Sequence, residues 1–462
     1  MGNSVRFLDS NPDQALGGVL LLRLERAHGG PARHVLSKTW MPGPLPVETP
    51  SRSDLKDRLT SRSTTADARL TAVDGGAGEL LYASGLGVQE DAGILTGRHH
   101  VAERLGELGS LSFFACEFLS QPPIIVSSSP ESAILAVHFT GGRPKEGMAP
   151  EAHYLDNADD LRALRFWNPE LPDGHTAEWS HFLSILSRVI PAGWSLTSVR
   201  SRVITLTHAP ELLANTNQSL ESDHLQYLLV AGISPGRLDV TSERLDELRV
   251  TPRKIGWHAL VMRDGLSFSL PRDDSLEFLR VYCHTIFLDV LLLAQTQMSA
   301  IREFDENFRK RSIADAAQLL SLEISYFNFK RLIWFDSMTR SKQKPMDVIL
   351  QRMQEQSNMH YDAQRFAEDI TEASRLASSL QARAAATQAD KIQESQERMN
   401  SLVQVLTALL APIGLCYTGA AVLFNPSVEA FVVTTSIGAA TTGVLLAALQ
   451  IQRRRHQKRN GL

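Results

Sequence analysis

Several small or polar residues near the C-terminal end of this 462-residue chain stand within an otherwise apolar stretch. Thr407, Gly414 and Thr418 have hydroxyl or small side chains, which leave room for water where large apolar side chains exclude it. Asn425 and Glu429, an amide and a carboxylate, follow them. Carboxylates that are repeated around an axis attract cations. The first three residues are therefore candidates for lining a pore, and the last two are candidates for its outer mouth.

Two uncharged runs have the length that is needed to hold these residues in a lipid bilayer. Residues 402–424 form a run of 23, which as a helix would extend roughly 34 Å at ~1.5 Å per residue, while the hydrocarbon core is ~30 Å thick. Residues 430–449 form a second run of 20. Only residues 425–429 separate the two runs, which predicts a tight external loop. We predict a two-helix transmembrane hairpin, and the alternative is a buried helical hairpin of a soluble domain.

Basic residues after the second run predict the orientation of this hairpin. Arg453, Arg454 and Arg455 belong to a basic tail, residues 450–462, whereas the loop at residues 425–429 has no basic residue. Basic flanks stay on the cytoplasmic side of a membrane. The N-terminal residues have no apolar core of a secretory signal. We therefore expect a multi-pass protein of the inner, cytoplasmic membrane, with both termini in the cytoplasm.

Small residues in both predicted spans favour close packing of helices. Gly414 and Gly419 lie in the first span, and Ala439 and Gly443 lie in the second. Small side chains let membrane helices approach each other, so we expect self-association within the lipid bilayer. Pro412 is expected to kink the first span or to free a backbone carbonyl there.

The stretch before the spans has the pattern of one long helix. Residues 346–401 contain neither Gly nor Pro, and Pro345 suits the first turn of a helix. A helix from residue 346 to residue 424 would be roughly 120 Å long. We predict that residues 345–401 form a coiled-coil-like stalk helix that enters the first span, and the alternative is a bundle helix that ends before the membrane. Apolar or small residues recur in steps of four and three, as in a heptad seam, at Phe366, Ile370, Ala373, Ala377, Leu380 and Ala384.

Two further helical stretches precede the stalk. They cover residues 275–309 and 312–335, and we predict that residues 273–344 form an antiparallel helical pair. His284 and Asp289 stand within the apolar pattern of the first stretch. We interpret both as hydrogen-bonded polar groups of a helical bundle rather than as catalytic residues.

Residues 1–272 mix strand and helix patterns, which predicts a cytoplasmic α/β or α+β domain. That this domain senses or binds a ligand is implied by the family resemblance described below, not by these patterns. A stretch rich in Ser, Thr and Arg predicts a mobile loop at residues 51–78. His99 and His100 are expected in an exposed loop or at the start of a helix. Predicted strands lie at residues 17–26, 122–140, 201–209, 225–234 and 257–271, the last a hairpin that turns at Asp264 and Gly265, and predicted helices lie at residues 99–120 and 176–190.

Residues with catalytic potential are sparse in this front domain. Neither a dinucleotide-binding nor a P-loop glycine motif is present. Asp173, His175, Glu178 and His181 form the group most like a metal site, but they are also ordinary residues around a first helical turn. The formal net charge of −4 gives no general attraction to nucleic acid. We therefore expect no enzyme activity, no cofactor, no bound metal and no nucleic-acid partner.

The order of these elements, an α+β cytoplasmic domain, a long stalk helix, a two-helix transmembrane hairpin and a basic tail, resembles the CorA-like divalent-cation transporter superfamily. The resemblance covers about the last 190 residues, and it is clearest at the sequence LVQVLTALLAPIGLCYTG, residues 402–419, with Pro412. In that family, five subunits pack their first spans around a pore and the second spans form an outer ring. The resemblance implies a homo-oligomeric ion channel or transporter, pentameric by analogy, with a divalent cation as ligand.

One departure from the family pattern changes what the resemblance implies. The family ends its pore helix with Gly-Met-Asn, whereas this chain has Ala421, Val422 and Leu423 there, and Asn425 comes two residues late. Magnesium selectivity is therefore not implied. One alternative is a membrane effector of bacterial antiviral defence that a nucleotide messenger gates, as in divergent CorA-like proteins. Another is a membrane-anchored coiled-coil protein that recruits a partner and conducts no ions.

Overall fold

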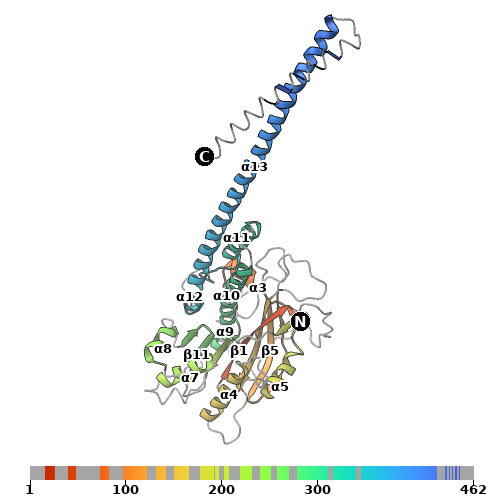
Figure 1. Cartoon of the computed structure of the whole chain (residues 1–462). Coiled ribbons are helices and arrows are strands. Elements are labelled where there is room, and N and C mark those ends of the chain that lie inside the picture. Colours follow the sequence, from red (N-terminus) through yellow and green to blue (C-terminus); the bar gives the residue numbers. More distant parts are fainter. Residues whose placement is uncertain are drawn as a thin grey trace. The chain divides into compact units, whose positions relative to one another are not determined.

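A computed structural model of the chain shows a mixed β-sheet flanked by helices and a long C-terminal helix (Figure 1). The chain divides into two units, Met1–Ala373 (unit 1) and Ser374–Leu462 (unit 2). The domain boundaries predicted from sequence stay predictions. The structure describes residues 16–26, 40–47, 73–82, 97–121, 132–141, 150–165, 177–191, 193–196, 202–207, 219–231, 240–250, 257–269, 278–310, 316–339 and 345–423, and positions 432, 433, 436, 440, 443, 444 and 447.

Strand β1 lies in the middle of the sheet, between β6 and β8. Its sequence is apolar almost throughout, which is typical of a strand that is buried on both faces. In the described part of the chain, eleven strands form one sheet in the order β2-β3-β5-β6-β1-β8-β11-β10-β9, with β4 beside β5 and β7 beside β1. All of these pairs are antiparallel except β8 with β11. The strands are β1 (Leu16–Arg26), β2 (Met41–Pro42), β3 (Arg98–Val101), β4 (Gly106–Leu108), β5 (Leu111–Ser120), β6 (Ser132–Gly141), β7 (Trp194–Leu196), β8 (Arg202–Thr207), β9 (Arg249–Val250), β10 (His258–Met262) and β11 (Gly265–Ser269).

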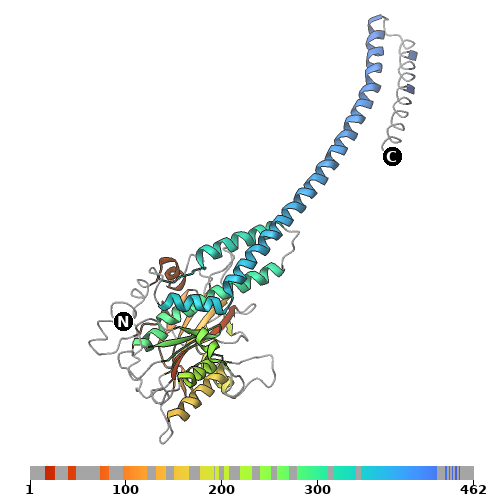
Figure 2. The same ribbon diagram turned by 90° about the vertical axis from the view of Figure 1, so that its left-hand side faces the viewer.

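Helices cover both faces of the sheet, because successive side chains of a strand point to opposite sides (Figure 2). On β1, Leu20 and Leu22 pack in one core with residues of α4, α5 and α7. Val19 and Leu21 point the other way and pack in a second core with residues of α3, α9, α10 and α12. The helices are α3 (Gly75–Tyr82), α4 (Pro150–Arg165), α5 (Ala177–Leu186), α7 (Ser219–Ala231), α8 (Ser242–Leu248), α9 (Phe278–His284), α10 (Ile286–Lys310), α11 (Ala316–Leu332), α12 (Pro345–Gln356) and α13 (Met359–Leu423).

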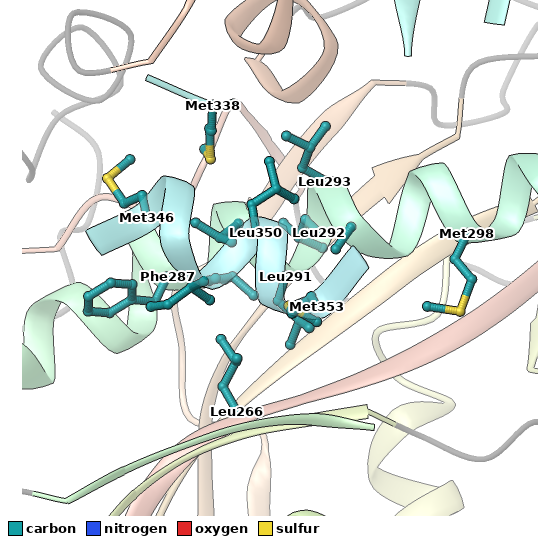
Figure 3. Packing of buried hydrophobic residues seen from close by; sticks show 14 of the residues in the cluster. Leu266, Phe287, Leu291, Leu292, Leu293, Met298, Met338, Met346, Leu350 and Met353 are labelled. Atoms are coloured by element: carbon teal, nitrogen blue, oxygen red, sulfur yellow. The ribbon is translucent and has the colours of Figure 1, made fainter. Parts of the chain in front are cut away.

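Figure 3 shows how α12 packs on α10 over the sheet. Leu350 and Met353 of α12 lie close to Leu291 and Leu292 of α10, and Leu266 of β11 lies between these helices and the sheet. All five side chains are buried. Burying one side chain of this size stabilises a fold by about 1.5–3 kcal/mol. Helices α10 and α12 are thereby held against the sheet as part of one core.

A break between α12 and α13 contradicts the single helix that was predicted from residue 346. Asn358 has a φ of 52°, the left-handed conformation that ends a helix. The N–H of Ser357 donates to the carbonyl of Met353 at 3.0 Å, and the N–H of Asp362 donates to the carbonyl of Asn358 at 3.0 Å. One helix therefore ends and the next begins at Asn358. The sequence rule missed this break because it looked for Gly and Pro, whereas Asn also tolerates the left-handed region.

Helix α13 runs without interruption from Met359 to Leu423 and has 65 residues, which corresponds to roughly 98 Å (Figure 1). It includes most of the predicted stalk and nearly all of the first predicted span. Pro412 lies inside the helix and does not end it. The expected continuity of helix from stalk into span is confirmed from residue 359 onward.

The first turns of α13 are fixed in unit 1 by aromatic side chains. Phe366 lies 5.3 Å from Phe304 of α10 and 5.3 Å from Tyr326 of α11, measured between ring centroids. The hydroxyl of Tyr326 donates to the carbonyl of Ala363 at 2.6 Å. Burial raises the pKa of Tyr326 to about 12, so this hydroxyl stays a donor. Ile370, one turn after Phe366, is also buried.

Most strands and helices predicted in the front domain are present, and two are wrong. The predicted strands at residues 17–26 and 201–209 are β1 and β8, the predicted helix at residues 176–190 contains α5, and the last hairpin is β10 with β11. That hairpin turns at Arg263 and Asp264, one residue earlier than predicted. Within the predicted strand at residues 122–140, β6 begins at Ser132, and residues 122–131 lie outside the described part.

The predicted helix at residues 99–120 is instead three strands, β3, β4 and β5. The chain reverses at Gly109, which has a φ of +55°, and the next residue, Ser110, donates its N–H to Asp160 at 2.7 Å. His100 is buried on β3 and not exposed at a helix start. Within the predicted strand at residues 225–234, residues 225–231 are the second half of α7 and residues 232–234 lie outside the described part, since a short apolar run does not distinguish a strand from a buried helix.

The predicted mobile loop at residues 51–78 is also partly wrong. Helix α3 begins at Gly75, and residues 51–72 lie outside the described part. Asp74 accepts a hydrogen bond from the N–H of Gly76 at 3.2 Å, as a residue at a helix start does. A Cβ on Gly76 would lie 2.9 Å from the ring of Phe335, so glycine here permits close packing. Gly76 thus lets α3 approach Phe335 closely.

Candidate membrane segment and buried charge network

Two helical stretches among the described residues are long and apolar enough to cross a membrane by length and composition, Leu279–Arg309 and Met359–Cys416. They differ in their surroundings. In Leu279–Arg309, 89% of the most apolar window is buried inside the protein, whereas in Met359–Cys416 the corresponding share is 0%. The first stretch therefore has protein around it, and the second has none from the described residues.

The stretch Leu279–Arg309 consists of α9 and α10, and we interpret it as core helix rather than as a membrane span. It carries buried polar side chains whose partners lie on other elements of unit 1. Gln297 donates from its amide nitrogen to the carbonyls of Ile333 and Phe335, each at 3.1 Å. Gln354 of α12 donates to the amide oxygen of Gln297 at 3.0 Å. These contacts fix the helix within the core.

The apolar segment of α13, defined as residues 402–416, contains only exposed and half-exposed residues. Leu402 is 59% exposed and Leu410 is 60% exposed, and no residue from 378 to 416 is buried. A soluble chain rarely leaves so long an apolar surface in water. Such a surface is typical of a helix that lipid or other helices cover.

The exposed part of α13 has two different faces. Side chains seven residues apart lie on nearly the same side of a helix, with a drift of only ~20° per heptad. One side carries large apolar residues, namely Ile392, Met399, Leu402, Val403, Leu406, Leu409, Leu410 and Ile413. The other side, which we call the polar stripe, carries Asp390, Gln393, Glu397, Asn400, Gln404, Thr407, Ala411 and Gly414.

Hydrogen bonds along the polar stripe are local. Gln393 donates to the carboxylate of Glu397 at 3.2 Å, and the hydroxyl of Thr407 donates to the carbonyl of Val403 at 2.8 Å. Thr407 therefore satisfies its donor within the helix and keeps its oxygen as an acceptor. Leu415, which is 73% exposed, is the one large apolar side chain beside the stripe within the apolar segment.

Two of the predicted pore-lining residues, Thr407 and Gly414, lie on the polar stripe. Thr418 lies on α13 at a position that continues the same spacing, but its side chain lies outside the described residues. Pro412, which has no N–H to donate, lies inside α13, and the kink or freed carbonyl expected there stays a prediction. The predicted outer-mouth and topology residues all lie outside the described part, namely Asn425, Glu429, Arg453, Arg454 and Arg455.

The second predicted span, residues 430–449, is described only at scattered positions. Each of these positions is helical and exposed. The hydroxyl of Ser436 donates to the carbonyl of Val432 at 2.7 Å, as serine does in a helix. The hairpin as a whole stays a prediction.

A second feature, in unit 1, is a network of buried charged side chains. Arg98 of β3 is fully buried, and its guanidinium donates to Glu117 of β5 at 2.8 Å and to Asp289 of α10 at 2.7 Å. The hydroxyl of Tyr82, at the end of α3, also donates to Asp289. Removing charges from water is costly unless they are paired, so these partners are needed. The interpretation of Asp289 as a hydrogen-bonded core residue is confirmed.

Two histidines extend this network. Nδ1 of His138 on β6 lies 3.0 Å from Nδ1 of His284 at the end of α9, and Nε2 of His138 lies 3.2 Å from a carboxylate oxygen of Glu117. The ring of Phe114 packs against both imidazoles, with centroid distances of 6.0 and 5.6 Å. His284 is thus a bonded core residue, as predicted. Arg98 and Glu117 were missed because residues 99–120 were predicted as a helix.

A separate polar cluster joins α7 to strands β9 and β10. The carboxylate of Asp223 accepts from Nε2 of His258 at 2.8 Å and from the guanidinium of Arg249. Burial alone would raise the pKa of Asp223, but the hydrogen bonds from His258 and Arg249 hold it below its usual value. This carboxylate therefore stays ionised and fixes both partners.

Metal ligands do not gather in the described part of the chain, where no group of three or more His, Cys, Asp or Glu side chains could hold a metal ion. Of the metal-like cluster considered from sequence, His181 is exposed and its Nε2 lies 3.1 Å from the carbonyl of Glu107. Asp173 and His175, and the side chain of Glu178, lie outside the described residues.

Comparison with known proteins gives little further information. No protein-family model matches the sequence, and no curated protein sequence matches it. One solved structure, the CorA magnesium transporter from Methanocaldococcus jannaschii, aligns with 55% of this chain and 92% of that chain, at 9% identity and a TM-score of 0.15. A TM-score this low means that the two structures do not superpose as wholes. The function is therefore inferred from the residues of this chain.

Proposed function

We propose that this protein is a homo-oligomeric membrane protein in which helix α13 of several copies crosses the bilayer and the polar stripes together line a path for ions. The observation that supports this proposal is the apolar segment, residues 402–416. It is uncharged, helical and unburied, and its apolar and polar residues lie on opposite sides.

The two faces of α13 explain why several copies of the chain, and not one, are needed to form a path for ions. The apolar side can face the lipid chains without the free-energy cost that it has in water. Gln404 and Thr407 on the polar stripe are costly next to lipid and gain partners or water when several helices turn their stripes toward one axis. Ala411 and Gly414 let the helices approach each other closely at this level.

The continuity of α13 supports a coupling role for unit 1. The helix that carries the polar stripe starts among the aromatic side chains of unit 1, at Phe366 and Tyr326. A change in the packing of these residues would alter the start of the same helix that crosses the membrane. We propose that the front domain binds a ligand, a divalent cation or a small nucleotide, and that this binding controls the path.

The sequence resemblance to CorA-like transporters, together with the missing Gly-Met-Asn motif, favours a channel or a ligand-gated defence effector without magnesium selectivity. In that form five copies surround the path in the inner membrane. A non-conducting membrane anchor is the second candidate. Leu415 favours it, because a ring of leucines beside the polar stripe would narrow or close the path.

The oligomer is tested first by the mass of the full chain purified in detergent. We expect an oligomer, pentameric if the resemblance holds. A monomer would contradict the proposal. Ion flux into liposomes that contain the full chain then separates a channel from a non-conducting anchor.

Cysteine labelling tests which face of α13 is wet. In a Cys416→Ser background, we compare Thr407→Cys on the polar stripe with Leu406→Cys on the apolar side, using a charged thiol reagent on the protein in liposomes. We expect fast labelling at position 407 and slow labelling at position 406. Equal rates at the two positions would show that α13 has no water-lined face.

A further inference from the structure

The histidine pair, His138 and His284, occupies an unusual place in unit 1. His138 lies in the middle of β6, and His284 is the last residue of α9, where the helix is interrupted at Thr285 before α10 begins. Both side chains are buried, with exposures of 0% and 4%. Their Nδ1 atoms are 3.0 Å apart, so the pair joins the sheet directly to a helix break.

The chemistry of this contact limits how many protons it can hold. Two ring nitrogens at 3.0 Å are bridged by one proton, which one imidazole donates and the other accepts. Nε2 of His138 lies 3.2 Å from the carboxylate of Glu117, which is an ion-pair distance without hydrogen-bond geometry. One imidazole can become charged and still donate across the contact. If both became charged, two N–H groups would point at each other and the contact would break.

The surrounding charges come from five elements. Glu117 of β5 faces His138 and attracts a proton to the pair. Arg280, one turn earlier on α9, repels a proton from His284. Arg98 of β3 holds Glu117, and Asp289 of α10 holds Arg98. Tyr82 of α3 completes the network by donating to Asp289. The histidine pair is thus connected through Glu117 and Arg98 to Asp289, so a positive charge on the pair changes the electrostatic balance of these buried groups.

Burial holds the pKa of His284 well below its usual value of 6.5, and repulsion from His138 and Arg280 acts in the same direction against the attraction of Glu117. The folded protein therefore resists the charge on His284 that an unfolded or opened segment accepts. Acid consequently favours a state in which the two rings have separated, because opening exposes His284 to water and restores its ordinary proton affinity.

We propose that the histidine pair is a pH-sensitive contact, which holds α9 and the start of α10 on the sheet at neutral pH and opens in mild acid. Helix α10 continues from this site to Phe304, which packs against Phe366 in the first turns of α13. Opening at one end of α10 therefore acts on an element that contacts the start of α13 at the other end. The proposal concerns unit 1 and does not depend on membrane crossing.

Hydrogen exchange of the full chain in detergent tests this proposal. We compare peptides from α9 and β6 with a control peptide from the hairpin β10–β11, at about pH 7 and about pH 5 after correction for the intrinsic rate. We expect opening of α9 and β6 to increase severalfold in acid, because the opened state binds a proton at His284 that the folded state resists, and we expect the control peptide to stay unchanged. Equal corrected protection of α9 at both pH values would overturn the proposal without any variant.

Two variants identify the groups that respond. His284→Asn places an amide where Nδ1 stood, which keeps a hydrogen bond to His138 but does not titrate, and we expect it to abolish the acid response. His181→Gln, at an exposed histidine of α5, is the matched control and should keep it. An unchanged acid response in His284→Asn would overturn the proposal. If that variant does not fold, as circular dichroism would show, His138→Gln takes its place with the same expected loss.

Discussion

The two apolar helical stretches of this protein have similar length and composition and opposite surroundings. In Leu279–Arg309 the polar residues are bonded inside unit 1, as the partners of Asp289 and Gln297 show. In the apolar segment of α13 the polar residues are gathered on one side and have no partner element beside them among the described residues. Apolar content alone therefore does not identify a membrane span. The position and the partners of the few polar residues separate a core helix from a segment that needs lipid or further helices.

The largest effect is expected where a charge inside the core helix loses its partner. Asp289→Ala leaves Arg98 with one carboxylate fewer in a fully buried site, and we expect a loss of about 3–5 kcal/mol in the free energy of unfolding. Chemical denaturation followed by circular dichroism measures it. Asp305→Ala, on the same helix but at an exposed ion pair with Arg309, should cost less than about 1 kcal/mol. Similar losses in both variants would show that the network does not hold α10 in the core.

The next effect should be confined to the exposed segment. Leu406→Glu places a charge on the apolar side of α13 near one end of the predicted span, where it costs less than the roughly 2.5–3.5 kcal/mol of a charge at the centre of a membrane helix. We expect less oligomer to be recovered from membranes, with an unchanged denaturation midpoint for unit 1. Thr407→Glu places the same charge on the polar stripe and should be tolerated better. Equal amounts of oligomer recovered from the two variants would show that the apolar side and the polar stripe do not have different surroundings.

A third prediction concerns pH and the cluster around Asp223. Its folded-state pKa is lowered, so the stability it contributes is fully present above the pKa of the unfolded carboxyl, about 4, and is lost as the pH falls through the folded value. Asp223→Asn removes charge-assisted hydrogen bonds and should cost about 1.5–3 kcal/mol at neutral pH. The difference in the free energy of unfolding between this variant and the unchanged protein should become smaller in acid. Denaturation at about pH 7 and about pH 3 measures both, and a pH-independent difference would contradict the assignment.

The sequence alone predicted those features of the fold that depend on local pattern. Strand β1 and the hairpin β10–β11 were found because continuous apolar runs and a turn at Asp264 act over a few residues. His284 and Asp289 were placed in the core because their neighbours are apolar. Pro412 was expected within a continuous helix, and it lies in one.

What the sequence did not show depends on distant partners. Arg98 and Asp289 are 191 residues apart, so no local pattern relates them. Gly109 could have indicated a turn between two strands, but the spacing of the apolar residues around it also fits an amphipathic helix, which is why a helix was predicted there. Asn358 ends α12 because its backbone adopts the left-handed conformation, which is uncommon outside glycine and which asparagine tolerates but does not require. The histidine pair was missed because His138 lies on a strand 146 residues before His284 in the chain.

The smallest effect tests whether the difference between the two faces of α13 also holds in the residues that precede the apolar segment. Glu394 and Glu397 are only three residues apart, yet Glu394 is bonded to Arg398 at 2.5 Å, whereas Glu397 belongs to the polar stripe. If the stripes surround an ion path, Glu397→Gln removes a ring of carboxylates at its cytoplasmic end. An exposed charge contributes about 0.2–1 kcal/mol, so the preference for cations over anions should fall by roughly 1.4- to fivefold in liposome flux. Glu394→Gln makes the same change in charge outside the stripe and should leave this preference nearly unaltered, and the reverse result would place the path on another face of the helix.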